Sequence, residues 1–303
     1  MAESRQREME ATTAETGYVA VERVEGKSTV TRCFSKYPLK LIVPKKVVPS
    51  TTDAVWIYSL SYGGGIVSGD RVACGVNVGD NCTVALTTQA STKVYKSVGS
   101  KCSEQVLEAR IGRNAFLAVI PDPVTCFSTA RYSQKQVFNL FSDSNLVVVD
   151  WITSGRHESG ERWNFQLYKS TNHIFGEDHL PLFIDSILLE ERSGTSIAEN
   201  MQDYQVIAMI IIMGPKLKNV QNQVVDEVKR MMSGHFRVPG PVTGRSGSKH
   251  DLKKPDLVAS CSTFGPKAGV VVRVAAMATE SVYMFLQHHL ASLEPLLGAL
   301  PYR

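Results

Sequence analysis

The sequence has no long hydrophobic run and little excess charge. Its longest unbroken apolar stretch, Val206–Met213, is far shorter than the roughly 20 residues that a membrane-spanning helix needs, so no membrane span is expected. The net charge of the 303-residue chain is only +4, and the basic residues are spread along it, which argues against a nucleic-acid partner. Hydrophobic residues make up 43% of the chain, enough for a large core and against wholesale disorder.

Cysteine is also scarce, and a targeting segment is not evident. The six cysteines include no C-x-x-C pair and are too few for a disulfide scaffold, so we expect reduced, buried thiols in a cytoplasmic protein. Cys74 and Cys82 are conceivable soft-metal ligands, although free cysteines are more often small buried hydrophobes. The glutamate-rich start lacks the apolar region of a secretory signal. We predict a flexible tail over residues 1–17 and a single β-rich domain over 18–303.

The residues that are abundant favour strands. Valine occurs 35 times and leucine 22 times, an inversion of the usual order. Short alternating segments are separated by turn signals such as Gly63-Gly64-Gly65, which predicts a mainly β fold with many short strands in stacked or sandwiched sheets. The predicted strands are Tyr18–Val24, Ser28–Phe34, Leu39–Val43, Ala54–Leu60, Val72–Val78, Thr83–Thr88, Gln105–Ile111, Phe116–Ile120, Gln136–Phe141, Leu146–Ile152, Arg162–Tyr168, Leu182–Leu188, Tyr204–Met213, Val258–Thr263 and Gly269–Ala275.

The last third of the chain adds helices. Apolar residues at helical spacing predict one helix over Leu217–Met232, ended by Gly234, and a second that begins at a Thr279 cap. The segment between the first helix and the next strand is rich in Gly, Pro, Ser and Lys. We predict an exposed, mobile loop over residues 238–256.

The glycine-rich segment Gly63–Asp70, GGGIVSGD, has part of the spacing of a phosphate-binding loop. The loop would need Lys and Ser or Thr next, whereas Asp70 and Arg71 follow, and an Asp carboxylate would repel phosphate. A strand pattern follows instead of a helix, so no helix N-terminus is available for an anion. The segment therefore favours a turn that needs positive φ angles rather than a nucleotide site.

The densest ionisable cluster is Ser154–Trp163, SGRHESGERW. His157, Glu158 and Glu161 resemble a broken zinc-protease box, because Glu stands where H-E-x-x-H needs its second His. A stable catalytic zinc site is therefore not expected, whereas a weak, transient cation site is an open alternative. The simpler interpretation is a hairpin between Leu146–Ile152 and Arg162–Tyr168 with a charged tip.

Two further polar groups have a simple interpretation as solvated surface. One contains His173, Glu177, Asp178 and His179, whose imidazoles and carboxylates suit nickel, zinc or copper but are irregularly spaced. The other is His288-His289, whose side chains point about 100° apart on a helix and do not chelate by themselves. The sequence contains no G-x-S-x-G elbow and no dinucleotide fingerprint, so a binding or scaffolding role is favoured over an enzyme.

Five strings in one order are informative together, although each alone would be weak. They are Tyr37-Pro38-Leu39-Lys40, GGGIVSGD at Gly63–Asp70, TTQASTKVYKS at Thr87–Ser97, PDPVTCF at Pro121–Phe127 and SGRHESGERW at Ser154–Trp163. Their order and spacing resemble the urease accessory protein D family, also called the H protein in some bacteria, from about Val30 to the end. Bacterial members tend to have an acidic P-Q-E-like segment where this chain has Pro121-Asp122-Pro123, and this difference, with the extended acidic N-terminal tail, resembles the plant branch.

The resemblance implies a protein that is not an enzyme, holds no stable cofactor and assists nickel insertion into apo-urease. The implied partners are urease accessory protein F, accessory protein G (a GTPase recruited through F) and apo-urease. It also implies an interior route that Ni²⁺ crosses transiently, which needs polar groups that replace hydration without trapping the ion. The candidates to line or gate this route are Asp70, His157, Glu158 and Glu161.

Two alternatives stay open at this point. The first is a metallochaperone that itself binds nickel at a defined His/Glu site, drawn from His157 with Glu161 or His173 with His179. The second is a hydrolase or nucleotide enzyme, which GGGIVSGD alone suggests.

Overall fold

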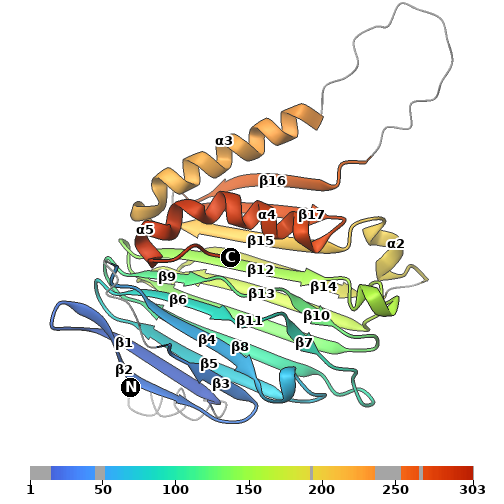
Figure 1. The fold of residues 1–303 in the computed structure, drawn as a ribbon, viewed down its shortest axis with the longest axis horizontal. Coiled ribbons are helices and arrows are strands. Elements are labelled where there is room, and N and C mark those ends of the chain that lie inside the picture. Colours follow the sequence, from blue (N-terminus) through green and yellow to red (C-terminus); the bar gives the residue numbers. More distant parts are fainter. Residues whose placement is uncertain (1–14, 45–51, 192–193, 236–253, 266–268, 303) are drawn as a thin grey trace, which may run out of the picture.

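The computed structural model describes residues 15–44, 52–191, 194–235, 254–265 and 269–302, and this part of the chain is mainly β, as predicted. Two large sheets face each other across an apolar core, and helices cover the outer side of one of them (Figure 1). None of the helices in these ranges combines the length and the hydrophobicity that a membrane crossing requires.

The first sheet has seven strands in the order β14-β13-β11-β8-β5-β1-β2. Its central pairs are parallel, and antiparallel pairs close it at both edges. The strands are β1 (Gly17–Val24), β2 (Lys27–Ser35), β5 (Arg71–Val78), β8 (Ser103–Ile111), β11 (Arg131–Leu140), β13 (Leu167–Phe175) and β14 (Pro181–Glu190).

The second sheet has ten strands, eight of them in the order β16-β17-β15-β12-β9-β6-β4-β3, with β10 paired to β12 and β7 paired to β10. Its strands are β3 (Leu39–Ile42), β4 (Val55–Ser61), β6 (Thr83–Thr88), β7 (Thr92–Val94), β9 (Phe116–Val119), β10 (Val124–Cys126), β12 (Asn145–Thr153), β15 (Val206–Met213), β16 (Leu257–Phe264) and β17 (Gly269–Ala276). The short strands β7 and β10 were not predicted from the sequence.

The chain alternates between the sheets from β5 to β13, and this winding explains the parallel pairing. The turn before β6 and the turn before β9 therefore lie next to each other. Asp80 Oδ1 accepts a hydrogen bond from the Arg113 backbone N–H at 2.7 Å, and the Asn114 side chain donates to that of Asn81 at 2.7 Å. Side-chain hydrogen bonds at such corners satisfy backbone groups that leave the sheets.

One predicted strand and its hairpin are wrong. The second strand begins only at Leu167, not Arg162, and it lies in the seven-stranded sheet, whereas β12 lies in the ten-stranded sheet. The segment between them crosses from one sheet to the other. Trp163 and Phe165 alternate because both are buried in an apolar cluster, and the Trp163 indole donates to the Tyr204 carbonyl at 2.9 Å. Their alternation therefore reflects core packing and not sheet pairing.

Two long helices, α3 (Lys218–His235) and α4 (Thr279–Leu290), cover the outer face of the ten-stranded sheet (Figure 1). Both were predicted, and their apolar faces pack in one cluster with β12, β15 and β17. Two details differ: α3 runs to His235, past Gly234, and the N-cap of α4 is Ala278, without a side-chain hydrogen bond, rather than Thr279. Smaller helices are α2 (Ile197–Met201) and α5 (Glu294–Leu297).

Thr16 and Gly17, the last two residues of the predicted tail, belong to the β fold. The Thr16 hydroxyl accepts from the Ala73 N–H at 2.9 Å and donates to the Ala73 carbonyl at 3.0 Å, and β1 begins at Gly17. Residues 1–14 of the predicted tail and residues 238–253 of the predicted loop lie outside the described ranges. Lys254, near the end of that loop, forms an ion pair with Asp203 at 2.8 Å.

Candidate functional site: a polar interior between the sheets

The inward face of the seven-stranded sheet changes from aromatic to polar to apolar along β11 and β13. Because side chains of a strand alternate, every second residue faces the other sheet. The paired positions are Tyr132 with Tyr168, Gln134 with Ser170, Gln136 with Asn172, and Phe138 with Ile174. All eight side chains are buried, so polar groups occupy the middle of the space between the sheets.

Asp150, on β12 of the opposite sheet, is the acceptor that these polar groups share. Its carboxylate accepts hydrogen bonds from Ser170 at 2.5 Å, Asn172 at 2.7 Å and Gln134 at 3.0 Å. Burial raises the pKa of Asp150, while these three hydrogen bonds lower it and offset part of that effect. A carboxyl group is thus held between the two sheets by donors that come from the facing sheet.

The tyrosines extend this network. The Tyr132 hydroxyl lies 3.0 Å from Gln105 Oε1 and 3.1 Å from Gln134 Oε1, and Tyr168 donates to Asp150 at 3.5 Å. Burial raises the pKa of both tyrosines, so they stay neutral donors near neutral pH. The network therefore offers hydroxyl and amide groups around one carboxyl group.

A narrow cavity of about 60 Å³, room for a few water molecules, lies beside this network. Its lining mixes aliphatic side chains with polar ones, including Gln105, Gln134, Gln136, Asp122 and Asp150. Polar groups of this kind can hold ordered water in an interior space. The cavity can thus hold water, and its polar side chains can replace part of the hydration shell of a small cation.

Thr88, at the end of β6, lines this cavity and also two clefts that open at the surface. Its hydroxyl accepts from the Asp122 N–H at 2.8 Å and donates to the Asp122 carboxylate at 3.3 Å. The Asp122 carboxylate also accepts from Tyr283 of α4 at 2.8 Å. The Thr88 and Asp122 pair therefore stands where the interior meets the surface.

Asp70, a predicted route residue, closes a turn outside this cavity. Its carboxylate accepts from the Val67 N–H at 3.0 Å and from the Tyr37 hydroxyl at 3.3 Å. The glycine-rich segment adopts the predicted turn: Gly69 has φ +83°, and β5 follows where a phosphate loop needs a helix. Asp70 is not among the residues that line the interior cavity.

The other predicted route residues lie on the crossing segment between the sheets. His157 and Glu158 are exposed, on a single helical turn over His157–Ser159. Glu161 is buried and bound by Arg156, whose guanidinium donates at 2.5 and 3.1 Å and lowers the pKa of the Glu161 carboxyl group. Arg156 also lies 4.0 Å from the centre of the Phe127 ring. The Glu161 carboxylate thus already has a cation partner.

The remaining sequence candidates are dispersed. Glu177 forms an ion pair with Arg113 at 2.8 Å, and His173 lies on β13. Burial raises the pKa of the Cys74 thiol to about 12, which disfavours the thiolate that a metal needs. Within the described ranges, the one group of three or more His, Cys, Asp or Glu ligand atoms within 4.8 Å of each other is Glu227, His288 and His289.

Asp150 was missed by sequence reasoning, although the sequence carries a signal for it. It interrupts the apolar run of Leu146–Ile152, all of which is buried. An ionisable residue within a buried strand needs partners, and those partners came from strands 16 to 22 residues away. The sequence also shows polar residues at alternate positions, Gln134 and Gln136 in one segment and Ser170 and Asn172 in another. It does not show that these four side chains share one face of a sheet.

Comparison with known proteins identifies the family of this chain. The family model described as "UreD urease accessory protein" matches residues 15–303. Urease accessory protein D of Arabidopsis thaliana is 61% identical over 95% of this chain and 99% of its own length, and that of Oryza sativa subsp. indica is 61% identical over 97% of both chains. A bacterial relative, urease accessory protein UreD of Anaeromyxobacter sp. (strain Fw109-5), is 32% identical over 94% of this chain and 88% of its own. The chain therefore belongs to the urease accessory protein D family.

Proposed function

We propose that this protein assists nickel insertion into apo-urease, as a scaffold for accessory proteins F and G and as a conduit for Ni²⁺. The observation that carries the conduit is the polar interior around Asp150, beside a cavity between two otherwise apolar sheets. Buried polar groups are costly unless they are bonded, and Asp150 and Gln134, which are bonded to each other, also line the cavity. Membership of the accessory family supports the scaffold.

The residues of the interior suit transfer better than storage. Amides, hydroxyls and the carboxyl groups of Asp122 and Asp150 can replace water around a divalent ion without the several strong ligands that would hold it. Asp150 is also already bonded to three donors, so it offers a passing ion limited capacity. Asp70, His157, Glu158 and Glu161 stay candidates for the outer part of the route.

The scaffold can be tested by co-purification. The tagged full chain, expressed with accessory proteins F and G and with apo-urease, is expected to retain all of them, and its deletion is expected to abolish urease activation. Full urease activation in cells that lack the chain would overturn the proposal.

The conduit needs a test that leaves the scaffold intact. Thr88→Phe places a large ring where the interior meets the surface clefts, and Thr88→Ser keeps the hydroxyl that bonds Asp122. Thr263→Phe is the matched control, because Thr263 is exposed on β16. We expect Thr88→Phe to lower urease activation at least severalfold without loss of co-purified F and G, while the other two variants activate normally. Normal activation by a folded Thr88→Phe variant would contradict the conduit.

A further inference from the structure

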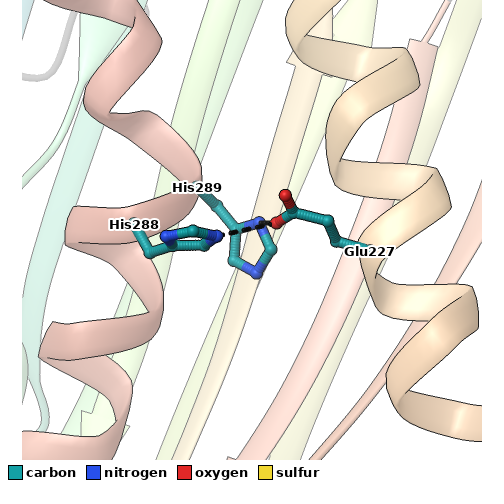
Figure 2. A group of neighbouring side chains, drawn as sticks. All are labelled: Glu227, His288 and His289. Atoms are coloured by element: carbon teal, nitrogen blue, oxygen red, sulfur yellow. Dashed lines mark hydrogen bonds and ion pairs between the residues drawn. The ribbon is translucent and has the colours of Figure 1, made fainter.

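A group of three side chains lies on the outer helical layer, on the far side of the ten-stranded sheet from the polar interior. Glu227 comes from the middle of α3, and His288 and His289 come from the last turn of α4 (Figure 2). Neighbouring helical residues point about 100° apart, so the two histidines cannot chelate an ion alone. The neighbouring helix α3 supplies the third group between them, which the sequence pattern could not show.

The ligand atoms converge on one carboxylate oxygen. Glu227 Oε2 lies 2.9 Å from His288 Nε2 and 3.0 Å from His289 Nδ1, and all three ligand atoms lie within 4.8 Å of each other. In a tetrahedral site with bonds of 2.0–2.1 Å, ligand atoms are about 3.3 Å apart. The two contacts with Glu227 are therefore within a few tenths of an ångström of that spacing.

We propose that Glu227, His288 and His289 form a binding site for a divalent first-row transition-metal ion, which joins α3 to α4. Two imidazoles and one carboxylate are ligands that zinc and nickel both accept. The site is open on one side: the His288 side chain is 69% exposed and that of Glu227 30%, whereas that of His289 is 6% exposed. Water would complete the coordination on the exposed side.

The surroundings favour a cation over a simple ion pair. His289 packs against the Phe285 ring at 4.1 Å between centroids, which fixes the orientation of its imidazole. The Arg230 guanidinium is 3.7 Å from the other carboxylate oxygen and its side chain is 75% exposed. The site also lies at the carbonyl end of α4, where positive charge is stabilised.

The site would act as a clamp between two helices that are far apart in the chain. Both helices pack on the same apolar cluster, and a metal ion bound to both would restrain their ends relative to each other. This consequence is independent of the conduit, because the interior polar network contains none of the three residues.

The test uses the full chain without a polyhistidine tag, titrated with Zn²⁺ or Ni²⁺ in separate calorimetry experiments and with Co²⁺ by visible absorption. We expect the unaltered chain to bind one equivalent of metal. His288→Ala and Glu227→Gln are each expected to lower the affinity for it at least tenfold, since loss of even an indirect ligand contact costs that much. Both substitutions remove a ligand, and Glu227→Gln keeps the side-chain shape. A tetrahedral Co²⁺ spectrum, lost in both variants, is also expected.

Glu280→Gln and Gln287→Ala are matched controls, because both side chains are exposed on α4 and neither belongs to the proposed site. They are expected to leave this metal equivalent unchanged. Saturating Zn²⁺ is expected to raise the unfolding temperature of the unaltered chain but not of His288→Ala. The proposal is overturned if the chain binds no metal with micromolar affinity, or if His288→Ala and Glu227→Gln bind it as tightly as the unaltered chain. Urease activation is not used as a readout, so the result is separate from that for the conduit.

Discussion

The carboxylate of Asp150, on β12 of one sheet, accepts a 2.7 Å hydrogen bond from the side-chain amide of Asn172, on β13 of the other. Both residues are buried, so this bond crosses the interior. A polar contact at this depth ties the two sheets in one register, because a slip of either strand would leave donors and acceptor unpaired. The network thus combines a structural constraint with the polar surface that a cation route needs.

Removal of the shared acceptor is expected to destabilise the protein. Asp150→Ala leaves the Ser170, Asn172 and Gln134 donors without their acceptor, and we expect the free energy of unfolding to fall by about 2–4 kcal/mol. Asp150→Asn keeps one acceptor oxygen and the volume, so its cost is expected to be about half as large. Urea unfolding followed by tryptophan fluorescence measures both. Equal stability of Asp150→Ala and the unaltered chain would show that the network carries no net stabilisation.

The raised pKa of Asp150 predicts a particular dependence on pH. Its folded-state pKa lies above the unfolded value of about 3.8, so the folded protein binds more protons between these two values. Stability relative to the Asp150→Asn variant is therefore expected to be greatest below the unfolded pKa and to fall as pH rises through the folded pKa. Unfolding curves of both proteins from pH 3.5 upward give the difference. An increase of the relative stability with pH would contradict the direction of this shift.

Most of the strands could be predicted from the sequence, because alternation and turn residues are local signals. The prediction of Arg162–Tyr168 failed because Trp163 and Phe165 alternate for burial in the core and not for pairing. The candidate site was harder, since Asp150 gains its partners through pairing between strands distant in the chain. The same is true of Glu227 and His288, which lie 61 positions apart and meet only through helix packing.

The C-terminal residues are expected to stabilise the end of β9 and the segment after it. The Pro121 carbonyl accepts from the Trp151 indole at 2.8 Å and from the Tyr302 hydroxyl at 2.9 Å. Tyr302→Phe removes one of two donors and is expected to cost about 1 kcal/mol. Tyr302→Ala also removes an edge-to-face contact with Trp151, with centroids 6.1 Å apart, and is expected to cost more. Thermal unfolding of the two variants checks whether Tyr302→Ala lowers the unfolding temperature more than Tyr302→Phe does. No loss of stability in either variant would contradict a stabilising role of the C-terminal residues.

The Arg156–Glu161 pair yields the last prediction, which bears on the crossing segment. Arg156 lowers the pKa of Glu161, so the pair contributes stability above the unfolded value of about 4.5 and loses it as pH falls through the folded value. Arg156→Ala leaves a buried carboxylate without its cation and is expected to lower the unfolding midpoint at pH 7 and to raise the pKa of Glu161. Arg156→Lys keeps a charge but loses the two-point contact, so its effect is expected to be intermediate. Denaturation of these variants at pH 4 and pH 7 measures their unfolding midpoints. The difference in midpoint between Arg156→Ala and the unaltered chain is expected to be smaller at pH 4 than at pH 7. A larger difference at pH 4 would contradict a stabilising ion pair.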